Sequence, residues 1–202
     1  MGAVPVFLKD KSTGQTVSAE LSDVVTDKHM DLVEKTWWPV LAAHFASVKS
    51  SGTPTALPEN IHWNWPAKMA RIKGVLAYRS FVLTYSGEVQ GLMQVNTAAV
   101  SRLPGQIGKH LAYVDYVETA PWNRLSIVKS PKFGGVGLTM IRAAIAASHD
   151  EGFHGRIGLH SLPQADEFYA KACGMSDLGQ DASLQNLRYF EMTPEQAAIF
   201  SN

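Results

Sequence analysis

The sequence predicts a domain of the α/β class, because strand-like and helix-like segments follow one another along its 202 residues. Residues 111–118 alternate in polarity and are rich in β-branched and aromatic side chains, which is typical of a strand. Residues 138–148 are rich in alanine and carry apolar side chains at helical spacing. With 46% hydrophobic residues, a chain of this length can bury the core of one domain.

The N-terminal part predicts a β-hairpin. Strand-like residues 4–8 and 15–21 flank a turn at residues 11–14. Residues 1–60 as a whole are expected to form either an extra layer of the domain or an arm that helps to form the acceptor site.

A long helix is expected after this hairpin. Asp27 is placed to cap a helix over residues 28–49, in which Pro39 is expected to cause a kink or a restart. Residues 50–58 have the composition of a loop. The aromatic cluster at residues 62–65 is expected to pack in the core or to line a pocket.

The remaining segments continue the alternation of strands and helices. Residues 80–85 and 89–95 predict a second hairpin, joined by Ser86, Gly87 and Glu88. After the helix at 138–148, the sequence predicts a strand at 155–160 and a late strand or strand-pair end at 184–192. Thr193 then precedes a last helix with Pro194 at its first position.

Glycines at positions 134, 135 and 137 lie at the junction between strand and helix. Backbone N–H groups at a helix N-terminus can converge on a phosphate, and the helix dipole favours the negative charge. The spacing matches neither the G-x-G-x-x-G dinucleotide fingerprint nor a Walker A loop, since Gly108-Lys109 is followed by His110. The junction therefore predicts a phosphate-bearing cofactor of another kind.

Residues 132–137, Lys-Phe-Gly-Gly-Val-Gly, resemble the loop that holds the acyl-CoA pyrophosphate in the GNAT superfamily of N-acetyltransferases. Lysine stands where that family usually has Gln or Arg. Residues 164–175 resemble the family's A-x-x-F-Y-x-K-x-G-F/M segment, with one extra residue before the glycine. The matching residues are Ala165, Phe168, Tyr169, Lys171, Gly174 and Met175. The resemblance covers residues 66–192 and implies one acyltransferase domain over 1–202, with 1–60 as an extension.

The resemblance implies a mixed, mostly antiparallel central sheet with helices on both faces. The sheet is expected to splay between the two strands that flank the cofactor loop. The implied activity is direct transfer of an acyl group, acetyl by default, from acyl-CoA to a primary amine of a small molecule, peptide or protein. Two alternatives stay open, a non-catalytic acyl-CoA-binding regulator or scaffold of the same fold, and a different phosphate ligand at the loop.

Acyl transfer to an amine needs a base for the amine, a donor for the oxyanion and a proton for the departing thiolate. The resemblance implies that Tyr169 supplies that proton. Glu118 ends its strand and is the candidate general base; strand alternation places Asp115 on the opposite face. His160 and Ser161, at the end of the next strand, are further catalytic candidates.

The expected cofactor contacts come from two segments. The backbone of Val117 and Thr119 is expected to pair with the pantetheine arm as an added strand would. The Lys132 ammonium is expected to meet a phosphate. The rest of the loop contributes Phe133, Gly134, Gly135, Val136, Gly137 and Leu138. Two departures from the family are the insertion at 122–130, a potential wall of the acceptor pocket, and Leu162 in place of an asparagine.

The net charge and the cysteine content limit which other functional classes and compartments fit the sequence. A net charge of zero argues against nucleic acid as a partner. Charged residues interrupt the first 25 positions, and no apolar run reaches membrane-spanning length. A single cysteine, Cys173, fits a reducing compartment, so a cytoplasmic protein is expected. The histidines lack metal-ligand spacing, so no metal is expected. The sequence leaves a homodimer open as the oligomeric state.

Overall fold

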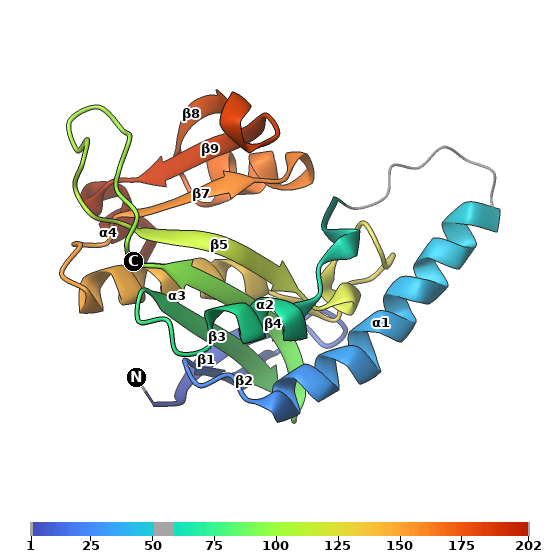
Figure 1. Cartoon of the computed structure of the whole chain (residues 1–202). Coiled ribbons are helices and arrows are strands. Elements are labelled where there is room, and N and C mark those ends of the chain that lie inside the picture. Colours follow the sequence, from blue (N-terminus) through green and yellow to red (C-terminus); the bar gives the residue numbers. More distant parts are fainter. Residues whose placement is uncertain (1, 51–58, 202) are drawn as a thin grey trace. The chain divides into compact units, whose positions relative to one another are not determined.

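The computed structural model describes residues 2–50 and 59–201, and its strands form a nine-stranded sheet in the order β6-β1-β2-β3-β4-β5-β7-β9-β8 (Figure 1). The sheet is mixed and mostly antiparallel, which confirms the predicted fold class. The chain divides into two compact units. Unit 1 comprises Met1–Gly74, Ser80–Leu92 and Glu118–Gly137, and unit 2 comprises Val75–Arg79, Met93–Val117 and Leu138–Asn202.

The N-terminal hairpin of unit 1 is confirmed (blue in Figure 1). Strand β1 (Val4–Asp10) pairs antiparallel with β2 (Thr16–Ser22). The other edge of β1 pairs with the short strand β6 (Phe133–Gly134), and β2 pairs with β3 (Tyr78–Tyr85). The hairpin is therefore integrated in the sheet, and its buried side chains are Leu8, Ala19 and Leu21.

Helix α1 (Asp27–Ser50) continues through Pro39, so the expected restart does not occur. The helix begins at Asp27, and the carbonyl of Thr26 accepts the N–H groups of His29 and Met30, so Asp27 lies in the first turn and is not the cap. The buried face includes Trp37, whose Nε1 donates to the carbonyl of Val89 at 3.1 Å. The loop predicted after residue 50 lies outside the described residues.

Helix α2 (Trp65–Ile72) was not predicted, and it follows the short helix η1 (Glu59–His62). Asn64 caps α2, because its side chain accepts the N–H of Ala67 at 2.8 Å. The Trp65 side chain is buried in the core, whereas Trp63 is half-buried and packs edge-on against it. The sequence signal for this helix was Asn followed two residues later by Pro66 in the first turn.

The second hairpin is confirmed as β3 and β4 (Glu88–Asn96). Its turn has two consecutive positive φ angles, 49° at Ser86 and 78° at Gly87. This conformation matches a type I′ turn, which suits the twist of a hairpin. Strand β4 is buried over most of its length, as a central strand should be.

Unit 2 contains the second half of the sheet. Strand β5 (Ala112–Thr119) pairs in parallel with β7 (Ile157–Ser161), and helix α3 (Val136–Asp150) lies between them in the sequence. Strand β9 (Leu187–Met192) pairs antiparallel with β7 and with β8 (Ser176–Asp181) (orange to red in Figure 1). Strand β8 was not predicted because its sequence, SDLGQD, contains no β-branched or aromatic residue.

The last helix, α4 (Pro194–Ser201), starts at the predicted proline. Thr193 and Gln196 cap it reciprocally, since Gln196 N–H donates to Thr193 Oγ1 at 3.2 Å and Thr193 N–H donates to Gln196 Oε1 at 2.8 Å. Within residues 2–50 and 59–201, the structure contains no helix of the length and apolar character needed to cross a membrane.

The pairing of β5 with β7 stops early. The register joins residues 112–114 with residues 157–159, and β5 then continues to Thr119. Beyond Val114 the β5 backbone has no ladder partner on β7 among the described residues. This divergence is the expected splay of the sheet.

Candidate functional site

The glycine-rich loop connects β6 with α3. Gly135 has a φ of +92°, a conformation that side chains with a Cβ rarely adopt. Helix α3 begins at Val136, two residues before the predicted start, so Gly137 lies inside its first turn. The first N–H groups of a helix have no partner within the helix. The loop therefore places backbone donors that have no acceptor within the helix at the positive end of a 15-residue helix.

The insertion at 122–130 holds this loop from one side. Lys132 N–H donates to the carbonyl of Trp122 at 2.9 Å, and Phe133 N–H donates to Asn123 Oδ1 at 3.0 Å. Buried Gln90 fixes the insertion in turn, because its Oε1 accepts Trp122 Nε1 at 2.9 Å and Asn123 Nδ2 at 3.0 Å. The Phe133 N–H is thereby used inside the protein and is not free for a ligand.

Two lysines lie at the loop in unit 1. The predicted Lys132 ammonium pairs with Glu88 Oε2 at 2.7 Å, and both side chains are about half exposed. Lys11, which sequence reasoning missed, lies across Gly134: a Cβ built on this glycine would be 2.6 Å from Lys11 Cε and 3.2 Å from its Nζ. No local signal could have found Lys11, because it reaches the loop through strand pairing between distant segments.

Glu118, the candidate base, is buried in unit 1 among three side chains that donate hydrogen bonds to it. Its Oε1 accepts Asn60 Nδ2 at 2.6 Å and Arg124 Nη1 at 2.8 Å, and its Oε2 accepts Trp65 Nε1 at 2.6 Å. Arg124 also donates to Asn60 Oδ1 at 3.2 Å. Burial raises the pKa of Glu118, while the bond from Trp65 and the charge of Arg124 oppose this rise. The extension (Asn60), helix α2 and the insertion (Arg124) thus meet at the candidate base.

Tyr169 lies in a π-helical turn, Phe168–Ala172, of unit 2. Cys173 N–H donates to the carbonyl of Phe168 at 3.0 Å, and this wider turn absorbs the residue that the sequence has in excess of the family segment. The Tyr169 ring packs against Phe168 and Phe190. Burial raises the pKa of Tyr169, so its hydroxyl stays protonated. Among the described residues that hydroxyl has no hydrogen-bond partner.

His160 and Ser161 are both engaged inside unit 2. The His160 Nδ1 and the Tyr113 hydroxyl are 2.6 Å apart, and His160 Nε2 lies 3.0 Å from Asp181 Oδ2. Burial lowers the pKa of His160, although Asp181 opposes the shift. The Ser161 hydroxyl donates to the carbonyl of Leu162 at 2.9 Å. Both ring nitrogens of His160 thus have partners within the protein.

A second buried carboxylate, Glu191 on β9, was not predicted as a site residue. Its Oε2 accepts the Ser101 hydroxyl, Leu103 N–H at 3.2 Å and Gln106 Nε2 at 3.2 Å, and its Oε1 accepts Arg102 N–H at 2.6 Å. All four donors belong to the loop that follows β4. Glu191 therefore fastens this loop to the sheet within unit 2.

The remaining predicted residues lie as follows. Val117 and Thr119 are half-buried at the end of β5, beyond the paired part of the strand. Val136 is buried, whereas Leu138 is half-buried at the start of α3.

Burial raises the pKa of the Cys173 thiol to about 12. Among residues 2–50 and 59–201, no three His, Cys, Asp or Glu side chains gather in a way that could hold a metal ion.

The chain is similar in structure to several acetyltransferases. No protein-family model and no curated protein sequence matches it. The PaiA N-acetyltransferase from Thermoplasma acidophilum, solved in complex with coenzyme A, is 12% identical, with a TM-score of 0.55 over 88% of this chain and 99% of that one. A GNAT-family acetyltransferase from Listeria monocytogenes has a TM-score of 0.53 at 11% identity, covering 87% and 95%. The GNAT domain of S. lividans PAT has a TM-score of 0.52 at 12% identity, covering 94% and 96%. The chain therefore has the fold of the GNAT acetyltransferases.

Proposed function

We propose that this chain transfers an acyl group, acetyl by default, from acyl-CoA to a primary amine. The observation that carries the proposal is the glycine-rich loop, which opens α3 with backbone donors that have no acceptor within the helix and with a left-handed Gly135. The similarity to PaiA, whose structure contains coenzyme A, supports the same ligand class.

The loop fits the diphosphate of CoA on chemical grounds. A phosphate oxygen accepts hydrogen bonds from backbone N–H groups at a helix start, where the dipole adds a favourable charge interaction. Gly135 leaves no Cβ in the way of the ligand, whereas the space over Gly134 is taken by the Lys11 side chain. The pantetheine arm would pair with the backbone of Val117 and Thr119, where β5 has left β7.

The proposed chemistry breaks the acyl C–S bond and forms an acyl C–N bond. Glu118 takes the proton of the attacking amine directly or through a water molecule, and its raised pKa brings a carboxylate closer to the range of an effective base. Tyr169 gives its hydroxyl proton to the departing sulfur. This role suits a hydroxyl that burial keeps protonated and that no described residue occupies.

His160 and Ser161 serve in this proposal as positioning residues. Because both imidazole nitrogens are held by Tyr113 and Asp181, His160 is set to fix the end of β7 and not to exchange a proton with substrate. Ser161 is the polar side chain next to Leu162, which stands where the family has an asparagine.

Ligand-dependent thermal unfolding tests the cofactor. A ligand that binds only the folded state raises the midpoint in a concentration-dependent way. We expect a rise with CoA, acetyl-CoA or a longer acyl-CoA, and none with ATP or NAD. Absence of a shift with every CoA species, or a larger shift with ATP or NAD, would overturn the proposal.

The Tyr169→Phe variant tests the chemistry. We expect kcat for thiol release from acetyl-CoA, measured with a panel of amines, to fall about 10- to 100-fold because the proton donor is lost. The CoA dissociation constant should stay within about twofold of the parent value, since the ring is kept. Unchanged kcat would remove Tyr169 from the catalytic role.

One observation favours the alternative of a non-catalytic acyl-CoA-binding protein. Glu118 Oε1 already has two donors and Oε2 has one, so three of the roughly four acceptor positions of this buried carboxylate are taken within the protein. Binding of CoA without thiol release across the whole amine panel would establish this alternative.

A further inference from the structure

The turn of the N-terminal hairpin is joined to the glycine-rich loop by backbone pairing. Lys9 pairs with Gly134 and Asp10 with Phe133 in the β1–β6 register. Lys11 N–H donates to the carbonyl of Lys132 at 2.9 Å. Lys11 is therefore placed at the loop by the sheet and not by its own flexible side chain.

The Lys11 side chain covers Gly134 closely. The 2.6 Å separation between Lys11 Cε and a Cβ built on Gly134 is shorter than any ordinary carbon contact, and Nζ would be only 3.2 Å away. The absence of a side chain at position 134 thus gives the Lys11 stem its path across the loop. Its ammonium ends close to Gly134, two residues before the start of α3.

The charge of Lys11 is not balanced by the protein. Among residues 2–50 and 59–201, its ammonium makes no ion pair or side-chain hydrogen bond, whereas Lys132 pairs with Glu88. Oδ1 of the neighbouring Asp10 is engaged within the turn, because it accepts Ser12 N–H at 2.8 Å and the Ser12 hydroxyl at 2.7 Å.

An ammonium next to a helix N-terminus is electrostatically unfavourable, because both carry positive charge. An anion bound between them is attracted both by the ammonium and by the helix N-terminus. Lys11, Gly134 and the start of α3 therefore make up one anion site. Its lysine is not among the residues that the family resemblance implies.

We propose that Lys11 binds the diphosphate of the CoA donor, with its ammonium donating to phosphate oxygens while α3 provides backbone donors. This inference rests on the proposed function and deepens it. It gives the N-terminal hairpin, which lies outside the family resemblance, a direct part in cofactor binding. Lys132, already paired with Glu88, becomes the secondary cation.

Isothermal titration with CoA, dephospho-CoA and pantetheine tests the assignment. For Lys11→Gln we expect about tenfold weaker binding of CoA and of dephospho-CoA, because a charge-assisted hydrogen bond is lost. Pantetheine, which has no phosphate, should bind Lys11→Gln and the parent equally. Lys11→Arg should retain most of the affinity, since it keeps the charge.

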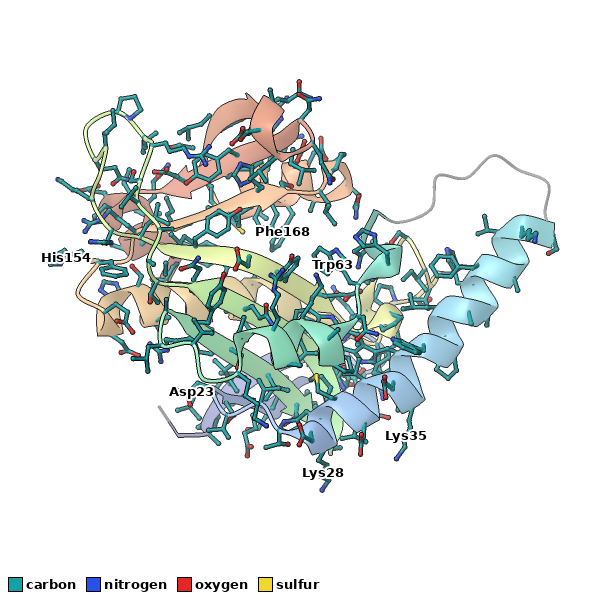
Figure 2. The ribbon with its side chains drawn as sticks, viewed as in Figure 1. Asp23, Lys28, Lys35, Trp63, His154 and Phe168 are labelled. Atoms are coloured by element: carbon teal, nitrogen blue, oxygen red, sulfur yellow. The ribbon has the colours of Figure 1, made fainter. Side chains whose placement is uncertain are left out.

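The matched control is Lys28→Gln on α1, which removes the same charge at a side chain that projects into solvent (Figure 2). Parent protein that binds CoA while Lys11→Gln and Lys28→Gln behave alike would overturn the role of Lys11 and leave the proposed function standing. A loss confined to CoA, with dephospho-CoA unaffected, would move the lysine to the 3′-phosphate and overturn the diphosphate assignment. Parent protein that binds no CoA species would overturn the proposed function itself.

Discussion

Glu118 in unit 1 and Glu191 in unit 2 are both buried carboxylates, yet their partners differ in kind. Glu118 faces the guanidinium of Arg124 and two side-chain N–H donors. Glu191 faces two backbone N–H groups, a hydroxyl and an amide of one loop. In the first cluster an opposite charge balances the carboxylate, whereas in the second neutral dipoles do so.

The difference separates a structural carboxylate from one suited to chemistry. Glu191 accepts hydrogen bonds from donors in the loop that follows β4. Removal of its carboxylate therefore leaves several of these donors unpaired. Glu118 is held by separate side chains from three segments, each of which can be changed individually. We expect mutations at Glu191 to reduce folding stability and mutations at Glu118 to reduce activity first.

The largest expected effect is that of Glu191→Ala. The change removes the Glu191 acceptor from the Ser101, Arg102 and Gln106 donors and leaves Leu103 N–H with Ser101 Oγ alone, at 3.2 Å. We expect it to lower the free energy of unfolding by about 3–5 kcal/mol. Urea denaturation followed by circular dichroism measures this loss. Glu167→Ala, at an exposed residue whose ion pair is with Lys171 one helical turn away, is the control and should change stability by less than about 0.5 kcal/mol. Similar values for the two variants would contradict the structural role of Glu191.

The next effect is that of Glu118→Gln on turnover. The amide keeps the shape but cannot accept a proton, so kcat is expected to fall about 100-fold with CoA affinity unchanged. A kcat within twofold of the parent would exclude Glu118 as the base. Arg124→Met is the partner variant: it leaves Glu118 buried without its cation and should lower stability by about 2–3 kcal/mol.

The raised pKa of Glu118 adds a pH dependence with a defined sign. Because the folded state releases this proton at higher pH than the unfolded chain, the unfolded state binds fewer protons between the two pKa values. The stabilising contribution is therefore complete below the unfolded pKa of about 4.3 and is lost as pH rises through the folded pKa. Stability curves of the parent and Glu118→Gln should therefore differ in slope within that window and run parallel below and above it.

The smallest expected effect concerns His160, whose pKa burial lowers. Between the lowered value and the unfolded value near 6.5, the unfolded state binds more protons, so stability rises with pH. Its side chain meets Asp181 and Tyr113, and the Arg102 charge also acts to lower its pKa. His160→Gln should remove about 1 kcal/mol or less of the stability difference between about pH 7 and pH 5.

The control for this prediction is His154→Asn, at an exposed histidine that projects into solvent (Figure 2). Asparagine tolerates the positive φ of 57° found there. The control should leave the pH dependence unchanged, and an equal flattening in both variants would assign the slope to general charge effects instead of the buried imidazole.

Local patterns predicted much of the fold. The two hairpins, the strands before and after α3, and the last helix at Pro194 all follow from alternation, helical spacing or capping residues. The elements that were missed have weak local signals: β8 is polar and contains Gly179, and α2 is only eight residues long. Their stability depends on packing against neighbours more than on propensity.

The sequence by itself determined the order of the elements, the glycine-rich junction and the segment around Tyr169, because each depends on residues close together in the chain. Only the tertiary structure decided which residues share a site. It placed Lys11 at Gly134, joined Asn60, Trp65 and Arg124 to Glu118, and enclosed His160 between Tyr113 and Asp181. Such contacts depend on strand pairing and burial between distant segments, and hydrogen bonds act over about 3 Å, so no local pattern encodes them.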